Sequence, residues 1–295
     1  MKKQILPVNI LLLIVLALIW GSSYFLMKRG LVTFSAMQVA MLRIIFAAIA
    51  LLPFLPKAIK NINRRDLFFA LVVGVLGSGI PTYLYPLAIT KIDSSITGII
   101  NALTPVFTVL FGWAFFQMKA TPVKLLGIGT ALFGASLLIL QGADGIAINQ
   151  FALIAVLATM CYGFSGNVLK TKLNHVKAAQ LTSLTFAMIC PVAIAILFTT
   201  DFMTVVTTHE QVVPSMIYIA ILGVFGTAFA LVLFNLLIKR TDALYASSVT
   251  FLIPIVALAW GFYDGENIGW AHFVGLAAIL VGVYMTNKQK QNTKG

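Results

Sequence analysis

Residues 74–112 read GVLGSGIPTYLYPLAITKIDSSITGIINALTPVFTVLFG, and residues 223–261 read GVFGTAFALVLFNLLIKRTDALYASSVTFLIPIVALAWG. The second stretch repeats the first after 149 positions, with glycines, an aspartate and a proline at the same places over 39 residues. Chance similarity between two leucine-rich helices is the alternative, but it does not account for a constant offset that includes Pro and Asp. The fold is therefore expected to contain one structural unit twice. The matched pairs are Gly74 and Gly223, Gly77 and Gly226, Asp93 and Asp242, Leu103 and Leu252, Pro105 and Pro254, and Gly112 and Gly261.

The composition is that of a chain surrounded by lipid. The 295 residues are 60% hydrophobic and 9% charged, with a mean hydropathy of +1.01, whereas a soluble domain is about 25% charged. Continuous apolar runs of about 20 residues cross a bilayer as helices, and because these runs do not alternate apolar with polar residues, helices are favoured over a barrel. The sequence predicts an all-α membrane protein with ten transmembrane helices. The runs are Val8–Met27, Phe34–Leu55, Leu67–Thr90, Ser95–Phe116, Val123–Gln141, Gln150–Leu169, Ala178–Thr199, Pro214–Ile238, Ala243–Tyr263 and Trp270–Thr286.

The first apolar run also has features of a secretory signal peptide, since Lys2 and Lys3 precede a leucine-rich stretch. The run is longer than is usual for such a segment, and no Ala-x-Ala site follows it. We therefore expect it to be the first transmembrane helix.

The repeat extends over most of the chain. At an offset of 142 the first two runs fall on the sixth and seventh, and at 148 the fifth falls on the tenth. These matches predict two five-helix repeats, residues 1–145 and 146–295. Five is odd, so the second copy enters the membrane from the opposite side and the repeats are inverted, as in transporters that work by alternating access. The additional pairs are Gly21 and Gly163, Ser23 and Ser165, Lys28 and Lys170, Gln38 and Gln180, Gly127 and Gly275, and Gly134 and Gly282.

The net charge of +12 is distributed by side of the membrane. With the N-terminus in the cytoplasm, sixteen of the 20 Lys and Arg residues lie in cytoplasmic segments and three in outer segments. Six of the eight acidic residues lie outside. The cation excess in short loops predicts a multi-pass inner-membrane protein with both termini cytoplasmic. The positive charge therefore reports topology and contact with the lipid bilayer, and gives no reason to expect a nucleic acid partner.

Enzyme chemistry has no evident place in the sequence. Cys161 and Cys190 lie within apolar runs, where they behave as small hydrophobic residues. His175, His209 and His272 are scattered near loops, and no metal-ligand spacing, phosphate loop or nucleophile motif is present. We expect no catalytic residue, no cofactor and no metal site.

Two prolines lie near the middle of the fourth and ninth runs. Proline displaces the carbonyl four residues earlier, which belongs to Asn101 for Pro105 and to Thr250 for Pro254. Each repeat thus offers a kink, a freed acceptor and a polar side chain at matching places, and we expect Pro105 and Pro254 to be hinges. The alternative is a kink compensated by neighbouring helices.

Candidate cavity residues come from clusters of small, aromatic and polar side chains. The first and sixth runs carry WGSSY at 20–24 and YGFSGN at 162–167. The third carries Tyr83 and Tyr85, which align with Val232 and Phe234. Tyrosines and amides in an apolar lining suit a small, partly apolar solute better than a sugar phosphate. Packing between helices explains any one of these residues equally well. The predicted substrate-binding residues are Trp20, Ser23, Tyr83, Asn101, Tyr162, Asn235 and Thr250.

Arg43 is the one charged residue well inside an apolar run. It is expected to face protein or water, because an unpaired cation in lipid costs about 3 kcal/mol or more. It either binds a carboxylate on a substrate or holds its helix in place, and the sequence favours the structural role.

The chain resembles the EamA branch of the drug/metabolite transporter superfamily. The resemblance covers nearly the whole chain and rests on Trp20-Gly21-Ser22, Leu42-Arg43, the two prolines and the Gly-x(6)-Gly ends of the fifth and tenth runs. It implies a basket of helices around a central cavity and a role such as amino acid or metabolite export. The sequence departs from the family at one place. The family often has a Glu in the loop before the last helix of each half, and Glu266 fits this position in the second half, but Met118 occupies it in the first.

The predicted function is a secondary transporter that exports amino acids or similar small metabolites by alternating access. A passive channel or facilitator is the first alternative, and a non-transporting membrane scaffold is the second. The expected partners are a small-molecule substrate and the lipid bilayer. The glycines of the fifth and tenth runs are expected to serve either helix packing within the chain or a homodimer contact.

Overall fold

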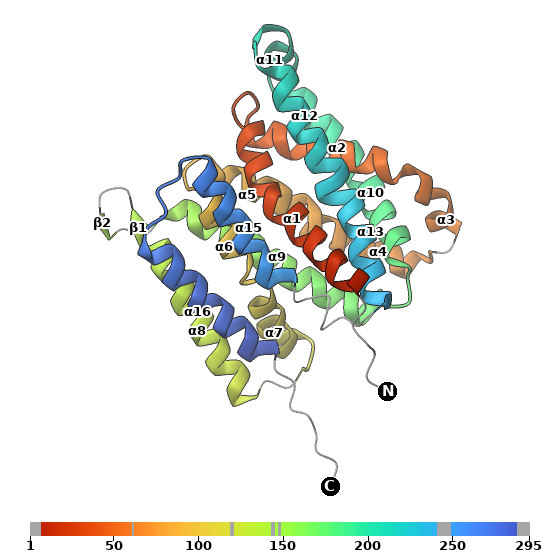
Figure 1. Cartoon of the computed structure of the whole chain (residues 1–295). Helices are drawn as coiled ribbons and strands as arrows, with labels where there is room; N and C mark the ends of the chain where they lie inside the picture. Colours follow the sequence, from red (N-terminus) through yellow and green to blue (C-terminus); the bar gives the residue numbers. More distant parts are fainter. Residues whose placement is uncertain are drawn as a thin grey trace.

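The computed structural model describes residues 7–60, 62–118, 121–142, 145–146, 149–240 and 249–287. Figure 1 shows a bundle of helices, with one short helix, α11, projecting beyond it. The prediction of an all-α membrane protein is confirmed, apart from a two-residue antiparallel ladder between β1 (Gln141–Gly142) and β2 (Gly145–Ile146). Within the described residues, eight helical segments are long and apolar enough to span a membrane, and Val249–Tyr263 and Trp270–Thr286 are shorter apolar helices.

Several predicted runs consist of more than one helical element. The first half contains α1 (Pro7–Gly30), α2 (Ala36–Leu51), η1 (Leu52–Phe54), α3 (Leu55–Lys60), α4 (Arg64–Gly74), η2 (Val75–Gly79), α5 (Ile80–Ile89), α6 (Ser94–Asn101), α7 (Thr104–Phe115) and α8 (Pro122–Ile139). The second half contains α9 (Gln150–Lys172), α10 (Ala178–Thr199), α11 (Phe202–Thr208), α12 (Val212–Gly223), η3 (Val224–Phe229), α13 (Ala230–Arg240), α15 (Val249–Tyr263) and α16 (Trp270–Asn287).

The repeated Gly-x-x-Gly motifs coincide with two wide turns of π-helix. These turns are η2 and η3, each of which directly follows Gly74 or Gly223. Glycine is required at Gly223 because the helices cross closely: a β-carbon there would lie 2.9 Å from the carbonyl oxygen of Arg43. Wide turns of this kind occur frequently at functional sites.

The fourth predicted run is interrupted in its middle. Helix α6 ends at Asn101 and α7 begins at Thr104, so that Pro105 occupies the first turn of α7. Proline is accepted there because the first amides of a helix have no intrahelical partner. Pro254, by contrast, lies within the uninterrupted α15. The two prolines are therefore not structurally equivalent.

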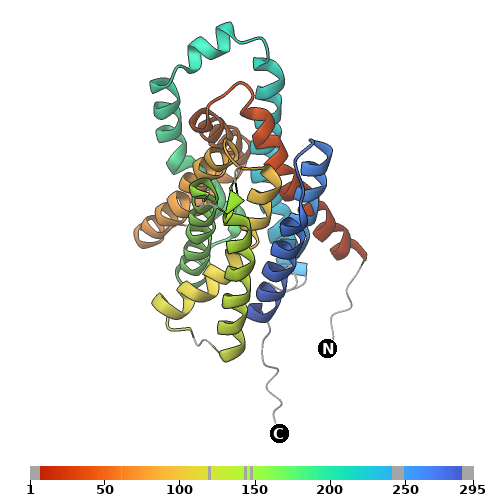
Figure 2. The same cartoon turned by 90° about the vertical axis from the view of Figure 1, so that its left-hand side faces the viewer.

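Helices α8 and α16 form a pair at one side of the bundle (Figure 2). Their glycines face each other: a β-carbon on Gly134 would lie 2.7 Å from the carbonyl oxygen of Gly275. The Gly-x(6)-Gly ends thus serve packing within the chain, and a homodimer stays a prediction.

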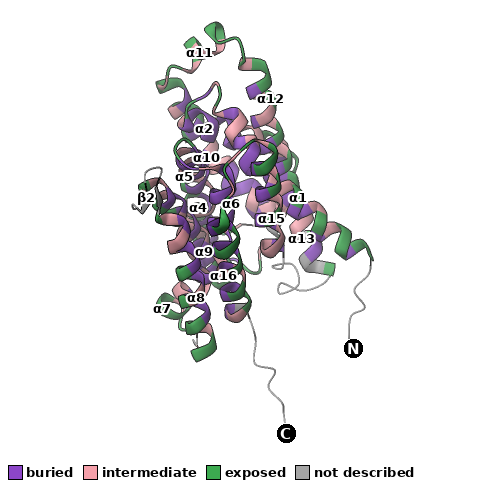
Figure 3. Ribbon diagram, turned by 60° about the vertical axis from the view of Figure 1, so that its left-hand side comes forward, coloured by how far each residue is buried: buried purple, intermediate pink, exposed green. Residues whose placement is uncertain are grey.

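The surface of the bundle is apolar, as a lipid-facing surface requires. Buried residues lie on the faces that meet inside the bundle and exposed residues on the outward faces (Figure 3). The exposed residues include large hydrophobic side chains such as Phe133, Phe198 and Phe262.

Candidate functional site

A central cavity of about 430 Å³ lies where both halves of the chain meet. Elements of the first half supply one part of its wall and elements of the second half the other. Its volume falls in the range of small-molecule sites. The lining residues are Trp20, Ser23, Tyr24, Met27, Arg43, Gly77, Ser78, Thr82, Tyr85, Asn101, Thr104, Tyr162, Ser165, Gly166, Phe186, Gly226, Thr227, Leu231, Phe234, Val249, Thr250 and Ile253.

Five of the seven predicted substrate-binding residues line this cavity, namely Trp20, Ser23, Asn101, Tyr162 and Thr250. Their role in binding stays a prediction. The side chain of Asn235 lies outside the described part of the structure.

Tyr83 is placed differently from the other predicted residues, and its role in substrate binding stays a prediction. Its side chain is not part of the described lining and packs instead on a core cluster to which α2, α10, α12 and η3 contribute. Tyr85 lines the cavity in its place. Two residues along a helix turn the side chain through about 200°, so only one of the two tyrosines can face the cavity.

The break before Pro105 presents a polar group to the cavity. Tyr85 donates its hydroxyl to the side-chain oxygen of Asn101 at 2.6 Å. The carbonyl of Asn101, which the proline frees, accepts a hydrogen bond from the Thr104 hydroxyl at 2.8 Å. The freed acceptor is thus satisfied locally, and its cost to stability is small.

Aromatic rings form much of the cavity wall. The rings of Tyr24 and Tyr85 meet edge to face with centroids 5.9 Å apart, and Tyr85 and Tyr162 are also 5.9 Å apart. Trp20 of α1 packs on Phe234 of α13 at 5.3 Å. The wall is therefore suited to an apolar or aromatic body on a ligand.

Arg43 of α2 lies at the cavity wall and is 9% exposed. Its Nε donates to the hydroxyl of Thr227 at 3.0 Å, and its Nη1 approaches the sulfur of Met27 at 3.8 Å. Thr227 in turn donates to the carbonyl of Leu222 at 3.2 Å. These contacts connect α2 with η3 and with α1. The structural role of Arg43 stays a prediction.

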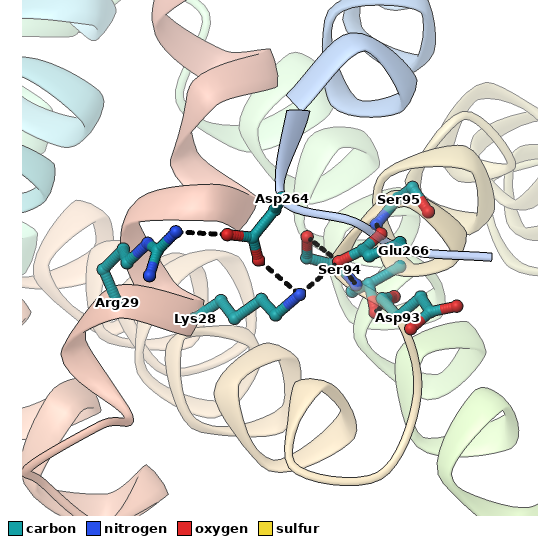
Figure 4. A network of polar contacts seen from close by, with 8 residues as sticks. Lys28, Arg29, Asp93, Ser94, Ser95, Asp264 and Glu266 are labelled. Atoms are coloured by element: carbon teal, nitrogen blue, oxygen red, sulfur yellow. Dashed lines mark hydrogen bonds and ion pairs between the residues drawn. The ribbon is translucent and has the colours of Figure 1, made fainter. Parts of the chain in front are cut away.

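A network of charges joins one end of α1 to the start of α6 and to the turn between α15 and α16 (Figure 4). The side chain of Glu266 is 1% exposed. One carboxylate oxygen accepts from the Ser94 amide at 3.0 Å, the Ser94 hydroxyl at 2.7 Å and Lys28 at 2.9 Å. The other accepts from the Ser95 amide at 3.0 Å. Glu266 therefore caps the N-terminus of α6 from a distant segment of chain.

Asp264 extends this network to the cations of α1. It pairs with Lys28 at 2.5 Å and with Arg29. We call the set Lys28, Arg29, Ser94, Ser95, Asp264 and Glu266 the α1–α6 clamp. The sequence identifies Glu266 and Met118 as matching positions but does not predict the clamp. Two features of the sequence nevertheless indicate such a network. Two of the three cations assigned to the outer side are adjacent, and most acidic residues are assigned to the same side.

The electrostatics of the clamp favour ionised Glu266. Burial opposes its charge, but hydrogen bonds from Ser95 and Ser94 and the nearby Lys28 outweigh burial and lower the pKa of Glu266 to about 2. Burial and the negative charge of Glu266 raise the pKa of Asp93. The clamp thus depends on a carboxylate that stays charged at physiological pH.

The turn that carries Glu266 has a counterpart in the first half. The amides of Glu266 and Met118 donate to the carbonyls of Gly261 and Gly112 respectively, both at 2.9 Å. The residue before each has a positive φ, 75° at Gly265 and 55° at Gln117. Met118 therefore occupies the place of Glu266 without its charge.

Among the residues that the structure describes, no group of three or more His, Cys, Asp or Glu side chains is placed to hold a metal ion.

The chain matches the EamA-like transporter family twice, over residues 8–140 and 150–288. It is 24% identical to "Uncharacterized inner membrane transporter YedA" of Escherichia coli strain K12, over 98% of this chain and 93% of that protein. It is 23% identical to "Uncharacterized transporter YoaV" of Bacillus subtilis strain 168, over 92% and 94%. It is 21% identical to "Probable amino-acid metabolite efflux pump" of Escherichia coli strain K12, over 93% of both.

One solved crystal structure shares the fold with a TM-score of 0.59 and 16% identity, covering 94% of this chain and 96% of that one.

Proposed function

The chain belongs to the EamA-like transporter family, and on that premise we propose that this multi-pass membrane transporter exports amino acids or similar small metabolites by alternating access. The observation that carries the proposal is the cavity of about 430 Å³ whose wall is shared by both halves of the chain. A site between two halves can be exposed to either side in turn when the halves rock against each other.

We further infer that the chain forms ten spans in two inverted five-helix repeats, residues 1–145 and 146–295. The double match of the family supports this inference. Contacts between the two halves support it too. In a two-fold arrangement, each contact between the halves is repeated by the equivalent residues with the halves exchanged. A β-carbon on Gly21 would meet Val256, and one on Gly163 would meet Phe107. Gly21 and Gly163 differ by 142, and Phe107 and Val256 differ by 149.

Two polar contacts at opposite ends follow the same rule. The Ser215 hydroxyl donates to that of Thr33 at 2.9 Å, and His175 lies 2.9 Å from Asp66. The offsets are again 142, from Thr33 to His175, and 149, from Asp66 to Ser215. Each contact joins a loop of one half to the start of a helix in the other half.

The proposed topology places both termini in the cytoplasm. The described ends of the chain, at the start of α1 and the end of α16, both lie away from α11 in Figures 1 and 2. An even number of spans and the loop charges agree with that arrangement. In this orientation the α1–α6 clamp lies at the outer end and holds that end closed.

Transport then requires the clamp to open and re-form in each cycle. Its partners come from α1 and α6 of the first half and from the turn before α16. The break at residues 102–103 and the π-turns η2 and η3 are the places where these helices can bend with least disruption. The hinge roles of Pro105 and Pro254 belong to this proposal.

The size and lining of the cavity favour a small solute with an apolar part. The relative named as an amino-acid metabolite efflux pump agrees with a substrate of this size. The polar groups Asn101, Tyr162 and Thr250 are the proposed contacts for its hydrophilic atoms, with Trp20 and Ser23 completing the wall.

Cysteine labelling tests alternating access. Cys161 and Cys190 are first replaced by Ala, and Ser23→Cys and Ser165→Cys are then introduced one at a time in inverted and right-side-out vesicles. A membrane-impermeant thiol reagent is expected to reach each cysteine from one side at a time, with the side changing as transport proceeds. Simultaneous access from both sides would instead identify a passive channel.

Flux measurements distinguish the scaffold alternative. Reconstituted protein is expected to show saturable counterflow of at least one amino acid or related metabolite. A scaffold would show none for any solute.

A further inference from the structure

Arg43 carries hydrogen-bonding capacity that its protein contacts do not use. A guanidinium group has five N–H donors. The structure gives Arg43 one oxygen acceptor, the Thr227 hydroxyl, and one weak acceptor, the Met27 sulfur. No carboxylate among the described residues forms an ion pair with it. A structural role alone leaves this cation largely unneutralised.

The charge of Arg43 is costly in free energy at this place in the protein unless a negative charge lies nearby. Arg43 is more than nine-tenths buried and lies in a helical segment long and apolar enough to span a membrane. Buried cations in such segments pair with an anion or face a water-filled cavity. Arg43 lines the cavity, where it is the only charged residue of the described lining. An anion that enters the cavity therefore finds one preorganised partner.

The rest of the lining defines the other part of the ligand. Phe186, Leu231, Phe234 and Ile253 are apolar, and the polar members are hydroxyl and amide groups. A phosphate monoester carries a charge of about −1.5 to −2 at pH 7, which the single cation of the described lining would leave partly unbalanced. A positively charged amine without an acid would be repelled. The chemistry that fits is one carboxylate on a small apolar or aromatic body.

The cation is present in only one half of the cavity. Its counterpart at an offset of 142 is Thr185, and the packing shows the equivalence: Gly223 faces the backbone of Arg43, and Gly74 faces that of Thr185. The ligand is therefore bound asymmetrically, with its carboxylate toward α2 and η3. The planar guanidinium group of an arginine can also hold a carboxylate by two parallel hydrogen bonds.

We propose that Arg43 binds the carboxylate of the transported solute, and that the solute is a small monocarboxylate with an apolar or aromatic body. This inference rests on the proposed function and adds to it a substrate class and a residue that selects it. The structural contact with Thr227 is retained, since it orients the guanidinium toward the ligand.

Three matched probes test the substrate class by calorimetric titration of the purified protein in detergent. Phenylalanine has a carboxylate and an ammonium group, 3-phenylpropanoate has the carboxylate alone, and phenethylamine has the ammonium group alone. The two carboxylates are expected to bind and the amine is not. A stronger response to phenylalanine than to 3-phenylpropanoate would identify amino acids within the class. Binding of the amine but of neither carboxylate would overturn the inference.

Variants of Arg43 test the residue. Arg43→Gln keeps hydrogen-bonding groups without charge and is expected to weaken carboxylate binding about ten- to hundredfold. Arg43→Lys keeps the charge without the planar guanidinium group and is expected to be intermediate. Arg64→Gln, which removes an exposed cation of α4 away from the cavity, is expected to bind as the unaltered protein does. Size-exclusion profiles confirm that each variant is folded.

Counterflow separates failure of this inference from failure of the proposed function. Unchanged carboxylate binding or flux in Arg43→Gln would overturn the role of Arg43 while leaving the transporter intact. Saturable flux of only uncharged or cationic solutes would overturn the substrate class. Absence of saturable flux for every solute would overturn the proposed function itself.

Discussion

Glu266 accepts hydrogen bonds from both the amide and the hydroxyl of Ser94, a residue 172 positions earlier in the chain. The contact fixes the turn before α16 to the start of α6 and, through Lys28, to α1. A single buried carboxylate thus joins segments from both halves at one end of the bundle. Several properties of the protein are expected to depend on it.

Neutralising Glu266 is expected to lower the stability of this conformation. Glu266→Gln keeps the size of the side chain but replaces charge-assisted hydrogen bonds by weaker ones, at a cost of about 2–3 kcal/mol. Thermal unfolding in detergent measures the loss. Glu210→Gln, which neutralises an exposed acid outside the clamp, is the control and should change little. Equal melting temperatures for the two variants would contradict the capping role.

Acid is expected to weaken the clamp in a defined range of pH. The pKa of Glu266 is lowered from 4.5 to about 2, so the folded state favours the ionised form. Its contribution to stability is complete above pH 4.5 and is lost as the pH falls toward 2, with roughly 3 kcal/mol as its upper limit. Unfolding curves between pH 2 and 6 measure it. The Glu266→Gln variant should show a flatter dependence, and an unchanged slope would count against the assignment.

Asp93 is expected to act in the opposite sense. Burial and the charge of Glu266 raise its pKa, so the folded state disfavours its ionised form, and its effect on stability becomes unfavourable as the pH rises above the ordinary value of 3.8. Asp93→Asn should therefore stabilise the protein at pH 7. Lower stability of this variant would show that the carboxylate of Asp93 has a favourable partner.

Gln117 holds a backbone conformation that suits glycine. Its φ is 55°, and the equivalent residue of the other half is Gly265 at 75°. Gln117→Gly is expected to raise stability by about 1 kcal/mol, since it relieves left-handed strain that exceeds the entropy cost of glycine. Gly265→Gln should lower stability by a similar amount. Chemical denaturation of both variants measures the effect, and a loss in Gln117→Gly would be evidence for a side-chain role.

Gly77 and Ser165 are expected to be coupled. A methyl group on Gly77 would overlap the Ser165 hydroxyl at the cavity wall. Gly77→Ala should cost about 1–3 kcal/mol of stability through overpacking. Ser165→Gly in the same chain should recover most of that loss. Gly129→Ala, which has open space around it, is the control and should be neutral or slightly stabilising, and additive losses in the double variant would contradict the contact.

The sequence predicts the helical segments better than the orientation of single side chains. Continuous apolar runs identify the helices, and five of the seven predicted binding residues line the cavity, while the inverted arrangement of the two repeats stays a proposal. Tyr83 and Tyr85 are equally tyrosine, however, and only the rotation of α5 determines that Tyr85 faces the cavity.

Long-range polar contacts are the other part that pattern does not reveal. In the sequence, Glu266 is an acidic loop residue whose counterpart in the first half is Met118. No local sequence pattern indicates that Ser94 and Lys28 lie within hydrogen-bond distance of it. The same applies to the break before Pro105. The helix rule predicts a freed carbonyl at Asn101, but the Thr104 hydroxyl that satisfies it depends on the local geometry of the break.

Chemical locking of the clamp tests the central claim, that the outer end must open for transport. Lys28→Cys and Glu266→Cys are introduced into a chain whose Cys161 and Cys190 are replaced by Ala, and the pair is bridged with a short bifunctional methanethiosulfonate reagent in proteoliposomes. Counterflow is expected to stop on bridging and to return when a reductant releases the bridge, with each single cysteine variant unaffected by the reagent. Undiminished flux through the bridged protein would contradict alternating access at this cavity.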